Sequence, residues 1–421
     1  MKRVRVRYAP SPTGTPHIGN IRTALFNYLF AKNQKGDFIL RIEDTDRARL
    51  VPESVTKIKE SLELLNLKWD EEEHQSKRLD LYTKHLDILK DKGLAYEEEG
   101  AWRFKVEKGK TLKWNDVVHG PVKFASDVIE DFIIIKSDGY PTYHFASVVD
   151  DNDMRISHVF RGDEWISSTP KHLLLYESFE WEPPKFVHLP PILGEGHKKL
   201  SKRDGAKSVI EYIDEGYLPE AVVNFLAFLG WSPPSSEALS EGGKREKEIF
   251  SLDELTKIFS LDRINKNSPI FNLEKLNWFN GQWIRKLSDG KLADKIKNKF
   301  PDYDPEIIDK LAPLVKERLE NVNDFPKIAD FLFKSPSPQK SIVEKKTLSE
   351  FIKSLSGINW EAEKIKKAIE DFANGQKVEK KDLIISIRNV VAGRPVTPPL
   401  YESLEILGRD ETISRLTKYV G

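Results

Sequence analysis

The first part of the chain carries the pattern that most constrains its fold. Residues 4–9 alternate apolar and polar side chains, as a strand does, and the proline-rich stretch that follows excludes regular structure. Apolar residues then recur at helical spacing from His17 to Asn33, and residues 38–42 again favour a strand. A strand, a helix and a strand in this order form a right-handed parallel unit, which binds ligands at the carboxyl ends of its strands. We therefore expect the proline-rich loop and Glu43 to lie together at that edge.

The remainder of the chain predicts a larger parallel domain, an insertion and a helical half. Segments 156–160 and 185–189 favour buried strands with a helix between them, and residues 102–135 are rich in short strands. Beyond residue 206 helical spacing dominates. We predict an α/β fold in which a Rossmann-like domain, 1–80 and 140–205, is split by an α+β insertion, 81–139, and followed by helical regions at 206–290 and 291–421.

The composition limits the class of protein, its expected location and the chemistry that it can perform. Hydrophobic residues make up 39% of the 421 and charged residues 32%, which suits packed cores and excludes a disordered chain. Cysteine is absent, so disulfides, thiolate zinc ligands and cysteine nucleophiles are excluded. No apolar run approaches the roughly 18 residues that span a bilayer, and no signal segment follows Met1, so we expect a cytoplasmic protein without membrane contact. Lys+Arg and Asp+Glu both total 67, so any nucleic acid would bind through locally clustered basic residues.

Two short motifs suit the binding of phosphate. His17-Ile-Gly-Asn20 begins the first predicted helix, where backbone N–H groups and the positive helix end attract anions, and Gly19 permits a nucleotide to approach closely. Lys199-Leu-Ser-Lys-Arg203 places three cations on a glycine-flanked loop that could close over a polyphosphate. Taken singly, the first motif is equally compatible with a structural turn, and a motif like the second is more often a solvated basic loop.

Taken together, the two motifs are far more specific. The segment Ala9-Pro-Ser-Pro-Thr-Gly-Thr-Pro-His-Ile-Gly-Asn20 and the basic motif resemble the paired nucleotide-binding motifs of class I aminoacyl-tRNA synthetases. Four further segments resemble the glutamyl and glutaminyl branch of this class in its bacterial form. They are Arg41-Ile-Glu-Asp-Thr-Asp-Arg47, Asp138-Gly-Tyr-Pro-Thr-Tyr-His144, Val159-Phe-Arg-Gly-Asp-Glu-Trp165 and the segment from Gly393 to Gly408. The resemblance therefore covers nearly the whole chain.

The resemblance implies a function and roles for the predicted regions. It implies ATP-dependent activation of L-glutamate to glutamyl-adenylate, with Mg²⁺ accompanying ATP, and transfer to the 3′-terminal adenosine of tRNA(Glu). The insertion at 81–139 would bind the acceptor end of the tRNA, 206–290 its stem and 291–421 its anticodon. Many bacterial relatives carry a cysteine-rich zinc segment in the insertion, which this sequence lacks, so we expect no zinc and no protein-held metal. We expect a monomer.

Matching motif positions imply the site residues. The implied catalytic residues are His17, Gly19, Lys199 and Lys202. The implied ATP-binding residues are Thr13, His17, Asn20, Lys202 and Arg203. The implied glutamate pocket consists of Arg7, Ala9, Ser11, Glu43, Tyr143, Ser147 and Arg161.

The chemistry of glutamate independently favours several of these residues. An acidic amino acid presents one ammonium and two carboxylates. Glu43 can hold the ammonium, Arg7 and Arg161 can bind carboxylates, and the hydroxyls of Ser11 and Tyr143 can fix orientation. Each residue has an ordinary alternative, because Glu43 could cap a helix, Tyr143 could belong to the core, and the arginines could form structural salt bridges.

Nearby polar residues are compatible with structural roles. Asp150 and Asp151 could face the basic loop or Mg²⁺, but we favour a structural role for both. His144, His158 and His188 are expected in strands, with their ring nitrogens satisfied within the protein.

Other functions remain open at this point. The sequence does not separate a ligase for tRNA(Glu) from a non-discriminating one that also charges tRNA(Gln). A glutaminyl enzyme is disfavoured because Arg161 suits a charged carboxylate and because the C-terminal half predicts helices in place of β-barrels. A relative that modifies a tRNA base would lack the region 291–421. A catalytically silent RNA-binding paralogue would be expected to have lost one of His17, Lys202, Glu43 or Arg161, and all four are present.

Overall fold

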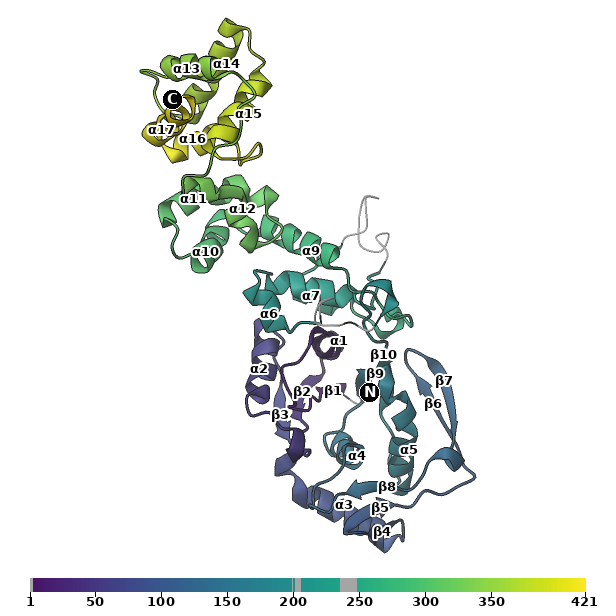
Figure 1. Ribbon diagram of the computed structural model, residues 1–421. Helices are drawn as coiled ribbons and strands as arrows, with labels where there is room; N and C mark the ends of the chain where they lie inside the picture. The colour runs from purple at the N-terminus through teal and green to yellow at the C-terminus, as the bar shows by residue number, and fades with distance from the viewer. Residues whose placement is uncertain (1–2, 199, 201–205, 235–247) are drawn as a thin grey trace. The chain divides into compact units, whose positions relative to one another are not determined.

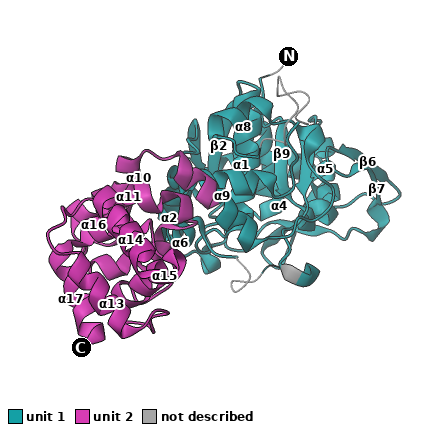
Figure 2. Ribbon diagram, turned by 90° about the horizontal axis from the view of Figure 1, so that it is seen from above, with its two compact units in different colours: residues 1–279 teal, residues 280–421 magenta. Residues whose placement is uncertain are grey.

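The structure is a computed structural model that describes residues 3–198, 200, 206–234 and 248–421. It divides into two compact units, Met1–Phe279 and Asn280–Gly421, which are teal and magenta in Figure 2. None of the described helices combines the length and the apolar character that crossing a bilayer requires.

The first unit is built on a five-stranded sheet (Figure 1). Its strand order is β10–β9–β1–β2–β3, and every adjacent pair is parallel. The strands are β1 (Arg5–Tyr8), β2 (Asp37–Ile42), β3 (Glu71–His74), β9 (His158–Gly162) and β10 (Lys185–Leu189). All residues of β2 are buried, as expected of a parallel strand that is covered on both faces.

Helices cover both faces of this sheet. They are α1 (Ile18–Asn33), α2 (Ser54–Leu64), α4 (Tyr143–Asp153) and α5 (Thr169–Ser178). On one face, Phe38 of β2 packs edge-on against Tyr28 of α1, with 5.7 Å between ring centres. On the other face, Arg7 of β1 and Arg41 of β2 both reach Asp151 of α4. The alternation of side chains along the strands thus serves two helical layers, and the predicted Rossmann-like α/β domain is confirmed.

Between β3 and α4 the chain forms an α+β insertion. Its elements are α3 (Leu79–Asp91), β4 (Ala95–Glu98), β5 (Ala101–Phe104), β6 (Thr111–Asp116), β7 (Gly120–Ala125) and β8 (Phe132–Ile135). Strands β4, β5 and β8 form an antiparallel sheet, and β6 pairs with β7 as a hairpin. Phe104 and Ile134 of the insertion share one buried apolar cluster with Phe145 of α4. The insertion is therefore packed onto the parallel domain.

Further helices lie in the rest of the first unit. They are α6 (Val209–Asp214), α7 (Pro219–Phe228), α8 (Leu252–Ile258) and α9 (Leu273–Lys286), the last of which runs past the unit boundary. Helix α6 starts with a capping box, in which the Ser208 side chain and the Glu211 side chain each accept the backbone N–H of the other residue. Ser251 and Glu254 form the same box at α8.

The second unit contains helices and no strand, over residues 280–421, all of which are described. The helices that begin in it are α10 (Asp289–Lys299), α11 (Pro305–Val315), α12 (Phe325–Ala329), α13 (Lys345–Ser354), α14 (Ala362–Gln376), α15 (Lys380–Val391), α16 (Leu400–Leu407) and α17 (Arg409–Val420). Leu348, Ile369 and Leu383 belong to a buried apolar cluster shared by these helices. The predicted helical C-terminal half is confirmed, and the boundaries of the four predicted regions stay a prediction.

One prediction about secondary structure was wrong. His144 was expected in a strand and lies in the first turn of α4. The reason is that Phe145, Val148 and Val149 follow at helical spacing and are all fully buried. His158 and His188 lie in β9 and β10, as expected.

Candidate active site

The carboxyl ends of β1, β2 and β9 meet where the winding of the sheet reverses. Strand β1 lies between β2 and β9, so the strand order runs from β1 to β2 and β3 in one direction and from β1 to β9 and β10 in the other. In parallel α/β sheets such a switch point is where ligands bind. The backbone N–H of Glu43, just beyond β2, donates to the carbonyl of Pro10 in the loop after β1, at 3.0 Å. The expectation that Glu43 and this loop share one edge is therefore confirmed.

His17 caps the N-terminus of α1. Its Nδ1 accepts a hydrogen bond from the backbone N–H of Gly19 at 3.1 Å, which places the proton of the neutral ring on Nε2. A Cβ at position 19 would lie 2.9 Å from the His17 ring, so glycine leaves room for this cap. The side chains of His17, Thr13 and Asn20 are exposed. The helix start therefore lies exposed, with the His17 ring beside it.

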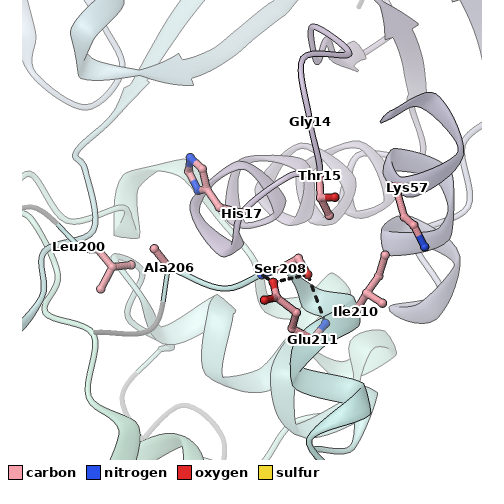
Figure 3. A pocket seen from close by; sticks show the side chains of 9 residues that line it. All are labelled: Gly14, Thr15, His17, Lys57, Leu200, Ala206, Ser208, Ile210 and Glu211. Carbon is pink, nitrogen blue, oxygen red and sulfur yellow. Dashed lines mark hydrogen bonds between the residues drawn. The ribbon is translucent and has the colours of Figure 1, made fainter. Parts of the chain in front are cut away.

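A cleft of about 690 Å³ opens beside His17 (Figure 3). Its lining residues are Gly14, Thr15, His17, Lys57, Leu200, Ala206, Ser208, Ile210 and Glu211. The backbone N–H of Ile18 donates to the carbonyl of Lys207 at 3.0 Å, and His17 forms an antiparallel bridge with Ser208. These contacts fix the segment after the basic motif to the start of α1.

Leu200, a residue of the basic motif, lines the wall of this cleft. Lys199, Lys202 and Arg203, the cations of the motif, lie outside the described residues. The two motifs that the sequence paired therefore border one cleft, and the contacts of the three cations stay a prediction.

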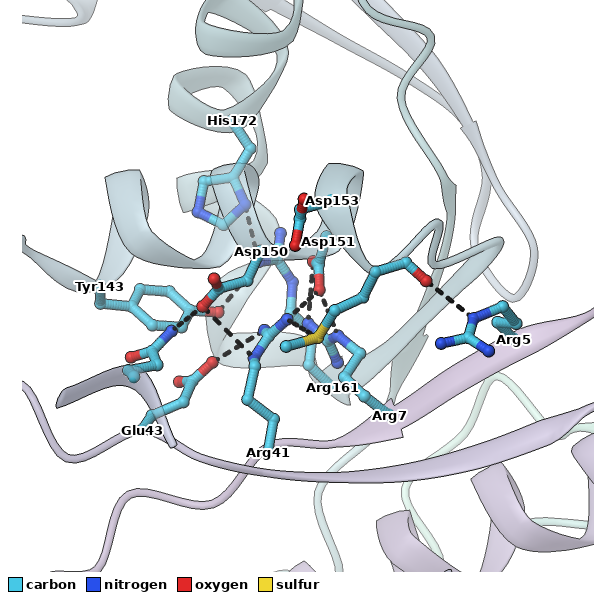
Figure 4. A network of polar contacts seen from close by, with 12 residues as sticks. Arg5, Arg7, Arg41, Glu43, Tyr143, Asp150, Asp151, Asp153, Arg161 and His172 are labelled. Atoms are coloured by element: carbon cyan, nitrogen blue, oxygen red, sulfur yellow. Dashed lines mark hydrogen bonds and ion pairs between the residues drawn. The ribbon is translucent and has the colours of Figure 1, made fainter. Parts of the chain in front are cut away.

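Glu43 belongs to a network of buried charged side chains (Figure 4). Arg41 is fully buried and donates to Oε1 of Glu43 at 2.9 Å and to Oδ1 of Asp151 at 2.6 Å. Arg7 donates to the same oxygen of Asp151 at 2.9 Å and to the carbonyl of Phe160 at 3.3 Å. Asp151 therefore bridges two guanidinium groups, which is a structural role.

Asp150 is also engaged within the protein. Its carboxylate accepts hydrogen bonds from Gln75, Arg78 and Tyr82, each at 2.8 Å. These contacts tie α4 to the segment that leads into α3, so the structural role favoured for Asp150 agrees with its surroundings.

The pKa values of the two carboxylates of the network are shifted in opposite directions. Burial raises the pKa of Glu43, and Arg41 and Arg7 offset this only in part, so the pKa stays above its ordinary value. Burial acts in the same direction on Asp151, but Arg41 and Arg7 outweigh it and hold its pKa below the ordinary value. Glu43 is thus a buried carboxylate whose charge the protein compensates incompletely, as suits a group that receives a cation.

Arg161 is a buried cation with no ion pair among the described residues. It is 6% exposed and lies near the carboxyl end of β9. Its Nε donates to Nε2 of His188 at 3.0 Å and its Nη2 to Oγ1 of Thr169 at 2.7 Å. Its Nη1 lies 3.2 Å from Oη of Tyr143 and 3.3 Å from Nδ1 of His172. These four contacts occupy four of the five N–H groups of a guanidinium, and no partner is a carboxylate.

The histidines around Arg161 stay neutral near pH 7. Burial lowers the pKa of His144 to about 4, with Lys171 and Arg161 adding to the effect. Burial and then Arg161 lower the pKa of His172. Burial also lowers the pKa of His188, although Asp116 acts against it. Arg161 is therefore surrounded by uncharged acceptors, and the salt bridge considered for it from the sequence is not found in the described part of the chain.

Sequence reasoning missed Thr169 and His172, which contact Arg161, and Asp116, which is joined to it through His188. Thr169 and His172 lie three positions apart on α5, so they share one helix face, and that spacing after the Val159–Trp165 motif was a usable signal. Asp116 ends β6 in the insertion, and no local pattern links it to the site. His188, expected only as a satisfied strand residue, is its partner at 2.5 Å.

The remaining predicted residues lie around the same edge. Tyr143 begins α4, and burial raises the pKa of its hydroxyl, which therefore stays protonated. Ser147 is one turn further along α4 and fully buried, and its hydroxyl has no hydrogen-bond partner in the described structure. Ala9 is half-buried and Ser11 exposed in the loop after β1. The contacts that these residues would make with a substrate stay predictions.

The described part of the chain holds no group of three or more His, Asp or Glu side chains arranged to bind a metal ion. We assign no metal site to these residues.

Comparison with protein families matches both halves of the chain. The model of the catalytic domain of class I tRNA synthetases, E and Q, matches residues 3–102 and 97–278. A model of an anticodon-binding domain matches residues 290–420.

Individual relatives agree over almost the full length. A glutamate–tRNA ligase of Dehalococcoides mccartyi is 38% identical and covers 98% of this chain and 96% of its own, and one of Chlorobium phaeovibrioides is 36% identical, covering 99% and 94%. The crystal structure of a glutamate–tRNA ligase from Elizabethkingia meningosepticum in complex with its amino acid superposes with a TM-score of 0.90 at 33% identity, covering 100% of this chain and 99% of the other. The chain therefore belongs to the class I tRNA synthetase family, in its glutamyl and glutaminyl (E and Q) group.

Proposed function

We propose that this chain catalyses the ATP-dependent ligation of L-glutamate to tRNA(Glu). The observation that carries the proposal is Arg161, a buried guanidinium bound only by neutral acceptors in the described structure. Such a charge is costly without an anion, and the side-chain carboxylate of glutamate supplies one. Glutamine, nearly equal in size, would leave the charge unpaired, so the residue favours glutamate by several kcal/mol.

Glu43 complements Arg161 at the other end of the amino acid. Its raised pKa reflects a carboxylate that Arg41 and Arg7 do not fully compensate, and the ammonium of glutamate would complete the compensation. The pocket then holds one anion and one cation at the positions where an acidic amino acid carries the opposite charges. The hydroxyl of Tyr143, whose oxygen faces Arg161, keeps its proton for donation to the same side-chain carboxylate.

The reaction has two steps. The α-carboxylate of glutamate attacks the α-phosphorus of ATP, and pyrophosphate leaves with the Mg²⁺ that arrived with the nucleotide. The 2′-hydroxyl of the terminal adenosine then attacks the carbonyl carbon of the adenylate and displaces AMP. No side chain acts as a covalent nucleophile, so catalysis consists of positioning and of stabilising negative charge on the phosphates.

The cleft beside His17 is where we place ATP. The Nε2–H of His17 would donate to a phosphate oxygen, and Thr13 and Asn20 lie exposed on the same loop and helix start. Lys199, Lys202 and Arg203 would neutralise the charge that grows on the leaving pyrophosphate. Leu200 on the wall of this cleft is the contact that supports placing their motif here.

The decisive experiment is ATP–pyrophosphate exchange with and without tRNA, with glutamate, glutamine and aspartate as substrates. We expect exchange with glutamate at a specificity constant at least about 100-fold above that with glutamine, since several kcal/mol separate the two. Absence of exchange with every amino acid would favour the silent RNA-binding alternative. Charging of purified tRNA(Glu) and tRNA(Gln) then shows whether the enzyme serves one tRNA or both.

A further inference from the structure

A chain of three side chains links the insertion to the guanidinium of Arg161. The Oδ2 of Asp116 lies 2.5 Å from Nδ1 of His188, and Nε2 of His188 lies 3.0 Å from Nε of Arg161. All three residues are buried, with Asp116 1% and His188 0% exposed. Because Arg161 has no carboxylate of its own in the described structure, Asp116 is the acidic group joined to it through one imidazole ring.

The two contacts of His188 require the same tautomer. On one side, a carboxylate oxygen accepts, so Nδ1 must carry the proton. On the other side, the guanidinium N–H of Arg161 donates, so Nε2 must present its lone pair. Thr169 Oγ1 also lies 3.3 Å from Nε2, but its hydroxyl can donate there or to the carbonyl of Trp165, also at 3.3 Å. Asp116 and Arg161 thus fix the ring from both sides.

Asp116 is itself held by the turn that follows β6. Its Oδ1 accepts the backbone N–H groups of Val118 at 3.0 Å and His119 at 3.1 Å. The next residue, Val117, donates to the carbonyl of Phe186 in β10 at 2.9 Å. The carboxylate therefore has one oxygen committed to the turn and the other committed to His188.

We propose that Asp116 and His188 are positioning residues for amino-acid specificity: Asp116 keeps the proton of His188 on Nδ1, so that Nε2 holds the Arg161 guanidinium in place for the side-chain carboxylate of the substrate. The proposal rests on the proposed function, in which Arg161 receives that carboxylate. It also means that a residue of the insertion sets the geometry of the amino-acid pocket, although it does not touch the substrate.

The sharpest variant is Asp116→Asn, which keeps the size of the side chain. Its amide oxygen can still accept from Val118 and His119, and its NH₂ group then faces Nδ1 of His188. That contact requires the opposite tautomer, which points an N–H at the N–H of Arg161. We expect kcat/KM for glutamate to fall about 10- to 100-fold, mainly through KM, with the KM for ATP unchanged and the glutamate-over-glutamine ratio reduced by a similar factor.

Asp131→Asn is the matched control. Asp131 also lies in the insertion, and its carboxylate likewise accepts from the backbone and from a side chain: the backbone N–H of Val106 at 2.8 Å and the hydroxyl of Tyr96 at 3.0 Å. In the described part of the chain, Asp131 contacts neither His188 nor Arg161. The same change of charge should therefore leave the glutamate-over-glutamine ratio at the wild-type value.

Two substitutions of His188 separate its two contacts. His188→Gln offers an oxygen at the ε position, where Arg161 needs an acceptor, whereas His188→Asn offers a donor at the δ position toward Asp116 and no acceptor that reaches Arg161. We expect the Gln variant to retain more of the glutamate preference than the Asn variant. In the His188→Gln background, Asp116→Asn should have little further effect, because the tautomer that it controls is gone.

The outcomes distinguish this inference from the proposed function. If wild-type protein shows no glutamate-dependent exchange, the proposed function fails. If the wild type is active but Asp116→Asn and Asp131→Asn give the same glutamate-over-glutamine ratio, the positioning role is overturned and Asp116 only stabilises its turn. A thermal melt of each variant accompanies the kinetics, and a loss of stability without a change in the ratio counts against the proposal.

Discussion

The two units of the molecule differ in what they bury. The first unit buries charged side chains along one face of its sheet, namely Arg7, Arg41, Glu43, Asp151 and Arg161. In the second unit, described throughout residues 280–421, Arg415 is the single buried residue among the Lys, Arg, Asp and Glu side chains. It donates to the carbonyls of Phe331 and Val391, each at 2.8 Å.

This difference separates a reactive core from a supporting one. A buried charge costs stability unless it is paired and hydrogen-bonded, so a cluster of them is kept where chemistry requires it. The helices of the second unit bury mainly apolar side chains and present most of their charged residues outward. The contrast predicts that removing a buried charge near the site of the first unit changes amino-acid activation, whereas removing the buried charge of the second unit changes stability at most.

The largest effect is expected for Arg161→Ala. The variant should lose about three orders of magnitude in kcat/KM for glutamate, which is about 4 kcal/mol, while the weak use of glutamine falls far less. Arg415→Ala is the matched control, because it also removes a buried guanidinium, in this case one that is held by two backbone carbonyls and paired with Glu411 in the second unit. Specificity constants for both amino acids, with a thermal melt, test the pair. A folded Arg161→Ala variant that still prefers glutamate would remove Arg161 from the pocket.

Asp151→Asn should be the most damaging change to the stability of the first unit. It removes the carboxylate shared by Arg7 and Arg41 and leaves two buried guanidinium groups short of negative charge. We expect a loss of about 3 kcal/mol in the free energy of unfolding, at the lower end for a broken buried pair because Arg41 keeps Glu43. Urea denaturation measures it. A loss below about 1 kcal/mol, the size expected of a surface pair, would contradict the role of Asp151 in balancing the two buried guanidinium groups.

His17→Asn tests the nucleotide cleft without breaking the helix cap. Asparagine is a good N-cap residue, so α1 should keep its start, but the variant lacks the Nε2–H donor. Adenylate formation should slow because about 2–4 kcal/mol of transition-state stabilisation is lost, while the affinity for glutamate changes little. Lys202→Ala should act on the same step, and the double variant should be less than additive if both side chains contact one polyphosphate. Single-turnover measurements of adenylate formation compare the single and double variants. Full additivity would place the two residues at separate sites.

Glu43 should make glutamate binding sensitive to mild acid. Burial raises its pKa, so the carboxylate gains its proton at a higher pH than an exposed glutamate, and the neutral form cannot hold an ammonium. The affinity for glutamate should therefore fall several-fold as the pH is lowered through the raised pKa, and binding there should release a proton. Calorimetry in buffers of different ionisation enthalpy measures that release. Glutamate affinity that stays flat from neutral pH down to 4.5, the ordinary pKa of a glutamate, would show that Glu43 does not bind the ammonium.

The smallest effect is expected for Glu411→Gln in the second unit. Glu411 pairs with Arg415 at 2.7 Å, but its side chain is 45% exposed, and Arg415 keeps its two carbonyl partners. The free energy of unfolding should change by less than about 1 kcal/mol. A loss comparable to that of Asp151→Asn would erase the distinction between the two cores.

Local patterns in the sequence predicted most of the fold. The alternation in residues 4–9 and the helical spacing after His17 predicted β1 and α1, because both depend on neighbours in the chain. The strand predicted at His144 failed because a short apolar run is compatible with either structure, and here its spacing packs α4 against α3, α5 and strands of the insertion.

The site was predictable only where its residues belong to motifs. Glu43 and Arg161 follow predicted strands, so the edge at which they lie could be inferred from topology. Asp116 could not be inferred, because its approach to His188 depends on how the insertion folds back onto β10. The incomplete compensation of Glu43 and the uncharged surroundings of Arg161 likewise arise from burial by several elements, which no single segment encodes.

The most direct test of the central claim is a crystal structure of the protein with L-glutamate bound. The claim is that the buried guanidinium of Arg161 receives the side-chain carboxylate. We predict a carboxylate oxygen about 2.7–2.9 Å from a guanidinium nitrogen of Arg161, with the ammonium on Glu43. A structure in which the side-chain carboxylate rests on Arg7, while Arg161 keeps only its neutral partners, would contradict the account.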